Sequence, residues 1–290
     1  MNMSEIITIQ DPQEWIPANL SGGQLYARLN QAVGTVRLSN LDGHLMQLDN
    51  DEWGISAEGY RACNVIAGIP TITPDTMRLP DGREVCNPCI EFDPATGTAD
   101  KFWSHKITIG KSPLGGLVVS SATVLFDIRV RFVRELMQKI ESNKDAGKLC
   151  MQESLSDEEK RSGIFIPFQG SIGVYGNHDN TDTIRVIQNL IINKEHGDKI
   201  VQTLAWKASI KQQPSMPPSK IKVVNGFANV LVVGYKLDMD LHELEAIAKE
   251  YKETGLVEGA EVLETVGNAS EDNSSTAELS LLSTEGGTRF

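Results

Sequence analysis

Residues 101–106 read Lys-Phe-Trp-Ser-His-Lys and place aromatic rings and cations close together. On a β-strand alternate side chains share a face, so Phe102 lies with Lys106, and Trp103 lies with His105. A single strand of nucleic acid offers bases that stack on aromatic rings and phosphates that pair with cations. Each stacked base is worth roughly 1–3 kcal/mol. The segment therefore favours a surface for single-stranded nucleic acid.

Other parts of the chain repeat this combination of ring and cation. A basic stretch at 129–134 carries three arginines, and Trp206-Lys207 repeats the aromatic-cation pairing in what we expect to be a second sheet. The alternative is that the aromatic rings pack in the core and the lysines only solvate an outer face. The predicted nucleic-acid contacts are Lys101, Trp103, Lys106, Lys111, Arg129, Arg131, Arg134, Trp206 and Lys207.

Turn signals predict the hairpins that must position these residues. Pro80-Asp81-Gly82 and the segment 93–97 each separate two short β-type runs, and residues 102–109 alternate like a half-buried strand. The runs on either side of Asn225-Gly226 predict the clearest hairpin, because this dipeptide suits a type I′ turn. Residues 164–175 also favour strand. The sequence thus predicts mainly antiparallel sheet.

Helical signals are fewer. Residues 126–143 carry apolar side chains at steps of three and four, with Arg129, Arg131 and Arg134 off that stripe, which predicts a central helix with a cationic outer surface. A capping box at Asp240–Glu243 opens a final helix that ends at Gly255. A short helix is expected within 23–33, and residues 183–192 fit either strand or helix.

These elements define the expected organisation, an α+β fold in four regions. Residues 1–34 form an N-terminal segment with a short helix, 35–150 a β-rich region with the basic helix, and 151–255 a second sheet with a helix. Residues 256–290 carry little apolar surface and predict a disordered acidic tail.

The charge distribution agrees with a positive middle between two acidic ends. The formal net charge is -12, yet residues 101–250 hold 20 Lys or Arg against 17 Asp or Glu. No apolar run approaches the length of a membrane span, and the first residues lack a secretory signal. Four cysteines at this length favour free thiols in a reducing compartment. We therefore expect a cytoplasmic protein without a membrane partner.

The layout resembles that of single-stranded-DNA-binding proteins of bacteria and their phages, which often join a β-rich domain to an acidic tail ending in an aromatic residue. Here the tail carries Glu271, Asp272, Glu278 and Glu285 and ends at Phe290, although Arg289 beside Phe290 departs from that pattern. The resemblance covers the layout and no diagnostic motif. It implies replication or recombination proteins as partners of the tail.

Two motifs suggest metal chemistry instead. Gly176-Asn177-His178-Asp179 resembles the metal-binding block of calcineurin-like phosphoesterases, with Asp42 and His44 as an opening pair of ligands. The other blocks of that family are missing from the sequence. Cys86-Asn87-Pro88-Cys89 is half of a zinc site at most, because a second Cys-x-x-Cys or His pair is absent.

The sequence as a whole favours a non-enzymatic protein, without a cofactor, that binds single-stranded DNA in replication or recombination. Such a function fits a phage or plasmid source. One alternative is a structural or assembly protein that forms homo-oligomers through its hairpins. The other is a metal-dependent phosphoesterase that uses the segment 176–179.

Overall fold

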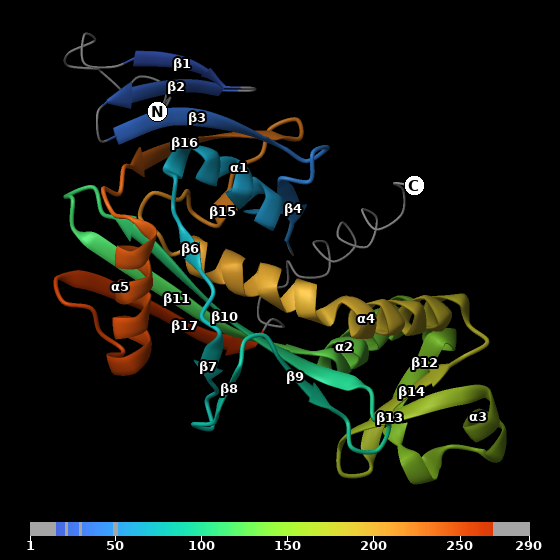
Figure 1. Ribbon diagram of the computed structural model, residues 1–290. Helices are drawn as coiled ribbons and strands as arrows, with labels where there is room; N and C mark the ends of the chain where they lie inside the picture. The colour runs from blue at the N-terminus through green and yellow to red at the C-terminus, as the bar shows by residue number, and fades with distance from the viewer. Residues whose placement is uncertain (1–15, 21–22, 29–30, 49–51, 269–290) are drawn as a thin grey trace, which may run out of the picture.

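The computed structural model of this chain describes residues 16–20, 23–28, 31–48 and 52–268 (Figure 1). The strands of the two larger sheets are β1 (Ile16–Leu20), β2 (Gly23–Arg28), β3 (Gln31–Ser39), β6 (Thr71–Ile72), β9 (Cys89–Phe92), β10 (Ala99–Lys111), β11 (Leu117–Asp127), β16 (Phe227–Tyr235) and β17 (Ala260–Asn268). The remaining strands are β4 (Leu45–Gln47), β5 (Trp53–Ile55), β7 (Thr76–Arg78), β8 (Glu84–Cys86), β12 (Gly147–Met151), β13 (Gly163–Gln169), β14 (Ile172–Asn177) and β15 (Lys220–Ile221). The helices are α1 (Ala57–Ala67), α2 (Ile128–Ser142), α3 (Asp157–Ser162), α4 (Thr181–Ile210) and α5 (Leu241–Thr254), with short 3-10 turns η4 (Lys144–Ala146) and η5 (Gln152–Ser154).

The central sheet has the strand order β17-β11-β10-β6, and β9 also pairs with β10. Helix α4 covers one face, where Phe102 packs with Ala122 and Ile200. Helix α5 covers part of the other face, where Ile107 packs with Tyr251. Because helices lie on both faces, β10 is buried along most of its length instead of alternating between core and solvent.

A second sheet, in the order β1-β2-β3-β16, lies at one end of the molecule (Figure 1). Its inner face packs Leu38 and Val232 against Tyr60 of α1. The predicted Asn225-Gly226 turn precedes β16, and both residues have the positive φ that a type I′ turn requires, 53° and 80°. Since β16 pairs with β3, residues far apart in the sequence form one sheet.

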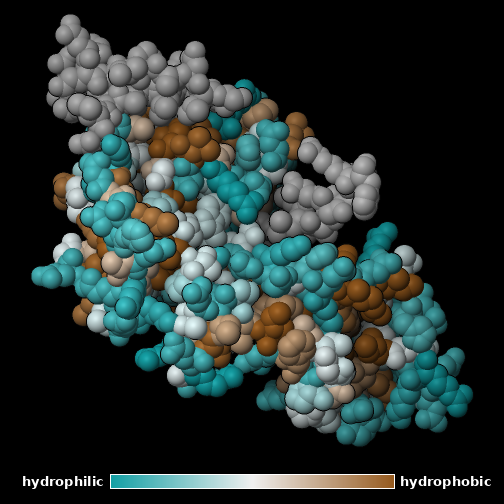
Figure 2. Space-filling model, viewed as in Figure 1, coloured by the Kyte–Doolittle hydropathy of each residue, from teal (hydrophilic) through white to brown (hydrophobic). Residues whose placement is uncertain are grey.

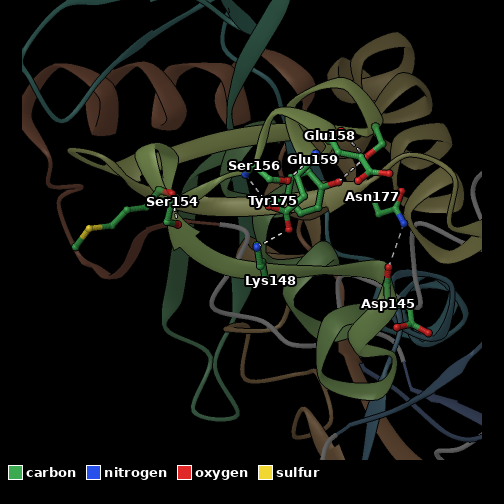
Figure 3. A network of polar contacts seen from close by, with 10 residues as sticks. Asp145, Lys148, Ser154, Ser156, Glu158, Glu159, Tyr175 and Asn177 are labelled. Carbon is green, nitrogen blue, oxygen red and sulfur yellow. Dashed lines mark hydrogen bonds and ion pairs between the residues drawn. The ribbon is translucent and has the colours of Figure 1, made fainter.

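The opposite end holds a three-stranded sheet in the order β12-β14-β13. One face packs Val174 against Leu136 of α2. A polar network joins the other face to α3 (Figure 3): Ser156 and Glu159 form a capping box, and Lys148 Nζ lies 2.5 Å from Glu159 Oε1. Tyr175 Oη lies 3.2 Å from Ser162 Oγ, which fixes the helix on the strands.

The structure confirms the α+β class, the antiparallel hairpins at Gly82 and at 93–97, the central helix and the capped final helix. The hairpin predicted around Asn225-Gly226 is limited to a bridge between Val224 and Phe227, because β15 pairs with β5 and β16 pairs with β3. The short helix expected within 23–33 is wrong, because residues 23–28 and 31–39 are strands β2 and β3. The tail was predicted to start at residue 256, but 260–268 form β17, which pairs in parallel with β11. The apolar side chains of Val257 and Val262 help to fill the core under α5. Residues 269–290 lie outside the described residues.

The segment 183–192, which fitted either strand or helix, lies in α4. Helix α4 is the longest helix of the described chain, with 30 residues, and it runs from the small sheet to the far end of the central sheet (Figure 1). Among the residues that the structure describes, no helix has the length and apolar character needed to cross a membrane.

Candidate nucleic-acid interface

The nine predicted contact residues lie on three elements that face different directions. Four are on β10, three on α2, and Trp206 and Lys207 are on α4 instead of in a second sheet. Three of the cations are buried: Lys106, Arg131 and Lys207 expose only 9%, 9% and 5% of their surface. The structure therefore does not gather the nine into one surface.

On β10 the alternation of side chains places Lys101 on the same face as Trp103. They lie on the face that carries α5, toward the end that α5 leaves uncovered. Lys101 stands between two acidic partners, Glu91 of β9 and Asp127 of β11, in the strand register. The Trp103 indole N–H is buried and has no partner in the described part of the chain. With a carboxylate on each side of its cation, this face is not suited to a polyanion.

Helix α2 is rotated relative to the predicted orientation. Its buried side includes Phe132 and Leu136, whereas Val130, which was expected to face inward, is 42% exposed. Arg131 points inward and its Nε lies 2.9 Å from Glu135 Oε1. Burial lowers the pKa of Arg131, while Glu135 opposes this effect. Of the three arginines only Arg129 is exposed, and it donates to the Pro167 carbonyl at 2.6 Å.

Trp206 of α4 and Lys106 of β10 lie near β6, whereas Lys111 of β10 lies near the end of β16. Trp206 Nε1 donates to Thr71 Oγ1 at 3.2 Å, close to where Lys106 bonds Thr73. Lys111 Nζ donates to the Lys236 carbonyl at 3.3 Å, just after β16 ends. Lys106 and Trp206 thus bond threonines two residues apart, and Lys111 reaches the end of the four-stranded sheet.

The ligands proposed for a metal phosphoesterase do not converge. Among the described residues no three His, Cys, Asp or Glu side chains form a group able to hold a metal ion. The segment 176–179 instead makes the turn before α4, where Asp179 N–H donates to Asn177 Oδ1 at 3.1 Å. Figure 3 shows Asn177 reaching toward the Asp145 carbonyl. The resemblance to the metal-binding block therefore reflects a polar turn.

The outer face of the four-stranded sheet has the combination of residues that the sequence analysis sought elsewhere. The Arg37 guanidinium carbon lies 3.9 Å from the centre of the Phe227 ring. Alternate residues of β16 share this face, because the residues between them pack on α1. We call this surface the platform; its described side chains are Val33, Thr35, Arg37, Phe227, Asn229, Leu231, Val233 and Tyr235.

The platform is open and its strands contain no acidic residue. Leu231 is 49% exposed, and Arg37 and Asn229 are also exposed. The chain contains 39 Asp and Glu, yet residues 15–41 and 199–237 contain none. These two segments meet where β3 pairs with β16. The strands that form the platform therefore carry no negative charge, although the protein as a whole is strongly acidic.

Sequence reasoning missed Arg37 and Phe227 because the expected helix within 23–33 concealed β3. The signal was present in two forms. Residues 32–38 alternate Ala, Val, Gly, Thr, Val, Arg, Leu, which places Thr35 and Arg37 on one face of a strand. The two segments without acidic residues are also visible in the sequence, although the pairing that joins them is not.

Comparison with protein-family models, curated proteins and solved structures finds no match. The function of the protein must therefore be inferred from its residues and their geometry.

Proposed function

We propose that this protein binds single-stranded nucleic acid, most specifically single-stranded DNA, across the platform. The observation that carries the proposal is the Arg37–Phe227 pair on an open sheet face whose strands lack acidic residues. The Phe227 ring is half-buried and the Arg37 guanidinium lies over it, so a base stacks on this pair and the guanidinium also pairs with the adjacent phosphate. The proposed contacts lie on β3 and β16 instead of on the residues predicted from sequence. The chemistry is the same, with an aromatic ring for the base and a cation for the phosphate. It places the protein in the cytoplasm, where replication and recombination occur.

The dimensions of the platform support an extended strand. Residues 227–235 of β16 span roughly 27 Å at the usual rise per residue. This length suits a site of about four nucleotides, the lower end of the range for sheets that bind single strands. Phe227 lies at one end of β16 and Tyr235 at the other. Lys111 Nζ donates to the carbonyl of Lys236, the residue after Tyr235, while the Lys236 ammonium pairs with Asp238 at 3.2 Å. Rings at both ends and cations beside them match alternating bases and phosphates.

The proposal is tested by fluorescence anisotropy of a labelled oligothymidine at about 50 and 200 mM salt. We expect binding that weakens steeply with salt. Phe227→Leu keeps an apolar side chain and removes the stacking face, so it should lower affinity by roughly 5- to 100-fold. Arg37→Ala should reduce the salt dependence by about one phosphate contact.

Matched controls separate the platform from exposed residues in general. Phe92 is 61% exposed on β9, and Arg161 is exposed on α3, so Phe92→Leu and Arg161→Ala should bind oligothymidine as the unmodified protein does. Circular dichroism shows whether each variant is folded. Absence of binding by the unmodified protein at low salt, or equal binding by the Phe227→Leu and Phe92→Leu proteins, would contradict the proposal.

A second candidate function, homo-oligomer assembly, is favoured by a separate observation. Leu149, Met151, Phe168 and Ile172 of the three-stranded sheet are 54%, 56%, 53% and 37% exposed. Figure 2 shows hydrophobic residues at the surface of this end of the molecule. Light scattering tests this candidate: an oligomer that Met151→Glu disrupts would support it, and a monomer at high concentration would exclude it.

A further inference from the structure

Lys106 is a buried cation without a carboxylate partner. It exposes 9% of its surface, and no Asp or Glu contacts it in the described part of the chain. Its ammonium donates to Thr73 Oγ1 at 2.7 Å and to Gln202 Oε1 at 3.4 Å, which are both neutral acceptors. An ammonium has three protons to donate, and burying an uncompensated charge is costly. An anion bound here would offset this cost.

The ammonium lies just below the surface at the junction of β6, β10 and α4. Thr71 and Thr73 are exposed at the rim, and Gln202 and Trp206 are one turn apart on the same side of α4. Trp206 Nε1 donates to the Thr71 hydroxyl at 3.2 Å, which leaves that hydroxyl's own proton available to a ligand. Figure 1 shows β6 running across α4 at this point.

Within the described chain no acidic side chain contacts the Lys106 ammonium, although Asp198 lies one turn before Gln202 on α4 and Asp75 follows Thr73 by two residues. Arg61 of α1 lies over the Trp206 ring at 5.4 Å, and its carboxylate partner Glu58 is on the solvent side of that helix. Residues 199–237, which include this part of α4, contain no acidic residue. Burial lowers the pKa of Lys106, and no neighbouring carboxylate opposes that effect. The groups around Lys106 thus offer an ammonium, two hydroxyls and an amide to an incoming anion.

We propose that Lys106, Thr73, Thr71 and Gln202 form a binding site for a phosphate group. The ammonium supplies the charge, and the hydroxyls and the Gln202 amide supply further hydrogen bonds to the phosphate oxygens. Trp206 borders the site and reports its occupancy by fluorescence. The site lies on the other side of α1 from the platform and does not depend on it. The phosphate comes either from a small phosphomonoester or from the backbone of a nucleic acid.

Thermal unfolding of the full chain tests this site with inorganic phosphate, thymidine monophosphate and oligothymidine as separate probes. At about tenfold excess over the Kd a bound phosphate raises the Tm by roughly 2–4 °C. We expect Lys106→Met to abolish this rise. Thr73→Val, at an exposed rim position, should weaken binding severalfold without affecting folding. Protection by all three probes that Lys106→Met abolishes identifies a phosphomonoester site. Protection by oligothymidine alone identifies a backbone phosphate when Lys106→Met abolishes it in the Phe227→Leu protein, whose platform lacks its stacking face.

Two controls make the outcome specific. Lys199 is exposed on the same helix, so Lys199→Met should respond to phosphate as the unmodified protein does. Phe227→Leu and Arg37→Ala should keep the phosphate response, so failure of the platform and failure of this site are distinguishable. An unmodified protein that no probe stabilises, or a Lys106→Met protein that phosphate stabilises equally, would overturn the proposal.

Discussion

The imidazole of His105 is buried between β11 and α5, and we expect it to make the protein sensitive to acid. Its Nδ1 lies 2.8 Å from Thr123 Oγ1, and its ring stacks on Tyr251 with 6.5 Å between the centres. Burial, with the nearby charge of Lys252, lowers the pKa of His105 from 6.5 to about 4. Glu264 on β17 contacts Tyr251 and not the imidazole. The folded protein therefore holds this ring neutral.

The magnitude follows from proton linkage. Below pH 6.5 the unfolded chain takes up a proton that the folded chain refuses until about pH 4. The free energy of unfolding therefore has its full value above about pH 7, where His105 is neutral in both states. It falls as the pH drops from about 6.5 to about 4. The full loss has a ceiling of about 3 kcal/mol, and the part between pH 7 and pH 5 is about 2 kcal/mol.

Urea unfolding at pH 7, 6 and 5 measures this loss through tryptophan fluorescence. We compare the unmodified protein with His105→Gln, which keeps a hydrogen-bonding group and cannot be protonated. The variant should lose about 2 kcal/mol less between pH 7 and pH 5. His178→Gln, at an exposed position, is the matched control and should behave like the unmodified protein. The reasoning is refuted if His105→Gln has the same pH dependence as the unmodified protein.

Three further predictions concern the packing of the core. Gly197→Ala should destabilise the protein by about 1–3 kcal/mol despite the better helix propensity of Ala, because a Cβ there overlaps the Phe102 ring; urea unfolding gives the value. Arg131→Met should lower the free energy of unfolding by roughly 3–5 kcal/mol, because it leaves the buried Glu135 without its cation, and adding Glu135→Leu should recover most of the loss. Burial raises the pKa of the Cys63 thiol to about 12, so mass spectrometry should find it unmodified by a thiol reagent at pH 8 in the native protein and modified in urea.

Local signals in the sequence identified the elements whose ends are defined by side-chain or turn chemistry. Helix α5 begins with the predicted capping box at Asp240 and Glu243 and ends at Gly255, which has a φ of 73°. The hairpin of β7 and β8 forms around Gly82, whose φ is 87°. In each case the residues that determine the geometry are within a few positions of one another, so a short stretch of sequence is enough to predict where the helix ends or the chain turns.

Elements that depend on distant partners were harder to predict. Residues 260–268 have the composition of a polar linker, and they form a strand because the edge of β11 offers unpaired backbone groups. Arg131 looks like a surface residue until Glu135 and the Phe126 ring are placed around it. Burial of a cation depends on tertiary partners, which periodicity within one helix does not reveal. The burial of Lys106 and Lys207 could not be predicted from sequence for the same reason.

The charge of the whole chain gave the weakest guide to the proposed interface, because charge acts locally. At physiological salt the Debye length is about 8 Å, so acidic residues more than a few side chains away from the platform are largely screened. The electrostatic potential at a bound phosphate depends mainly on the strands beneath it. The pairing of β3 with β16 brings together two segments without acidic residues. At physiological salt the net charge of -12 should therefore not prevent binding to this sheet. At low salt, where screening is weak, the distant acidic residues should slow association with nucleic acid. A binding rate that first rises and then falls as salt increases is the kinetic signature of this arrangement.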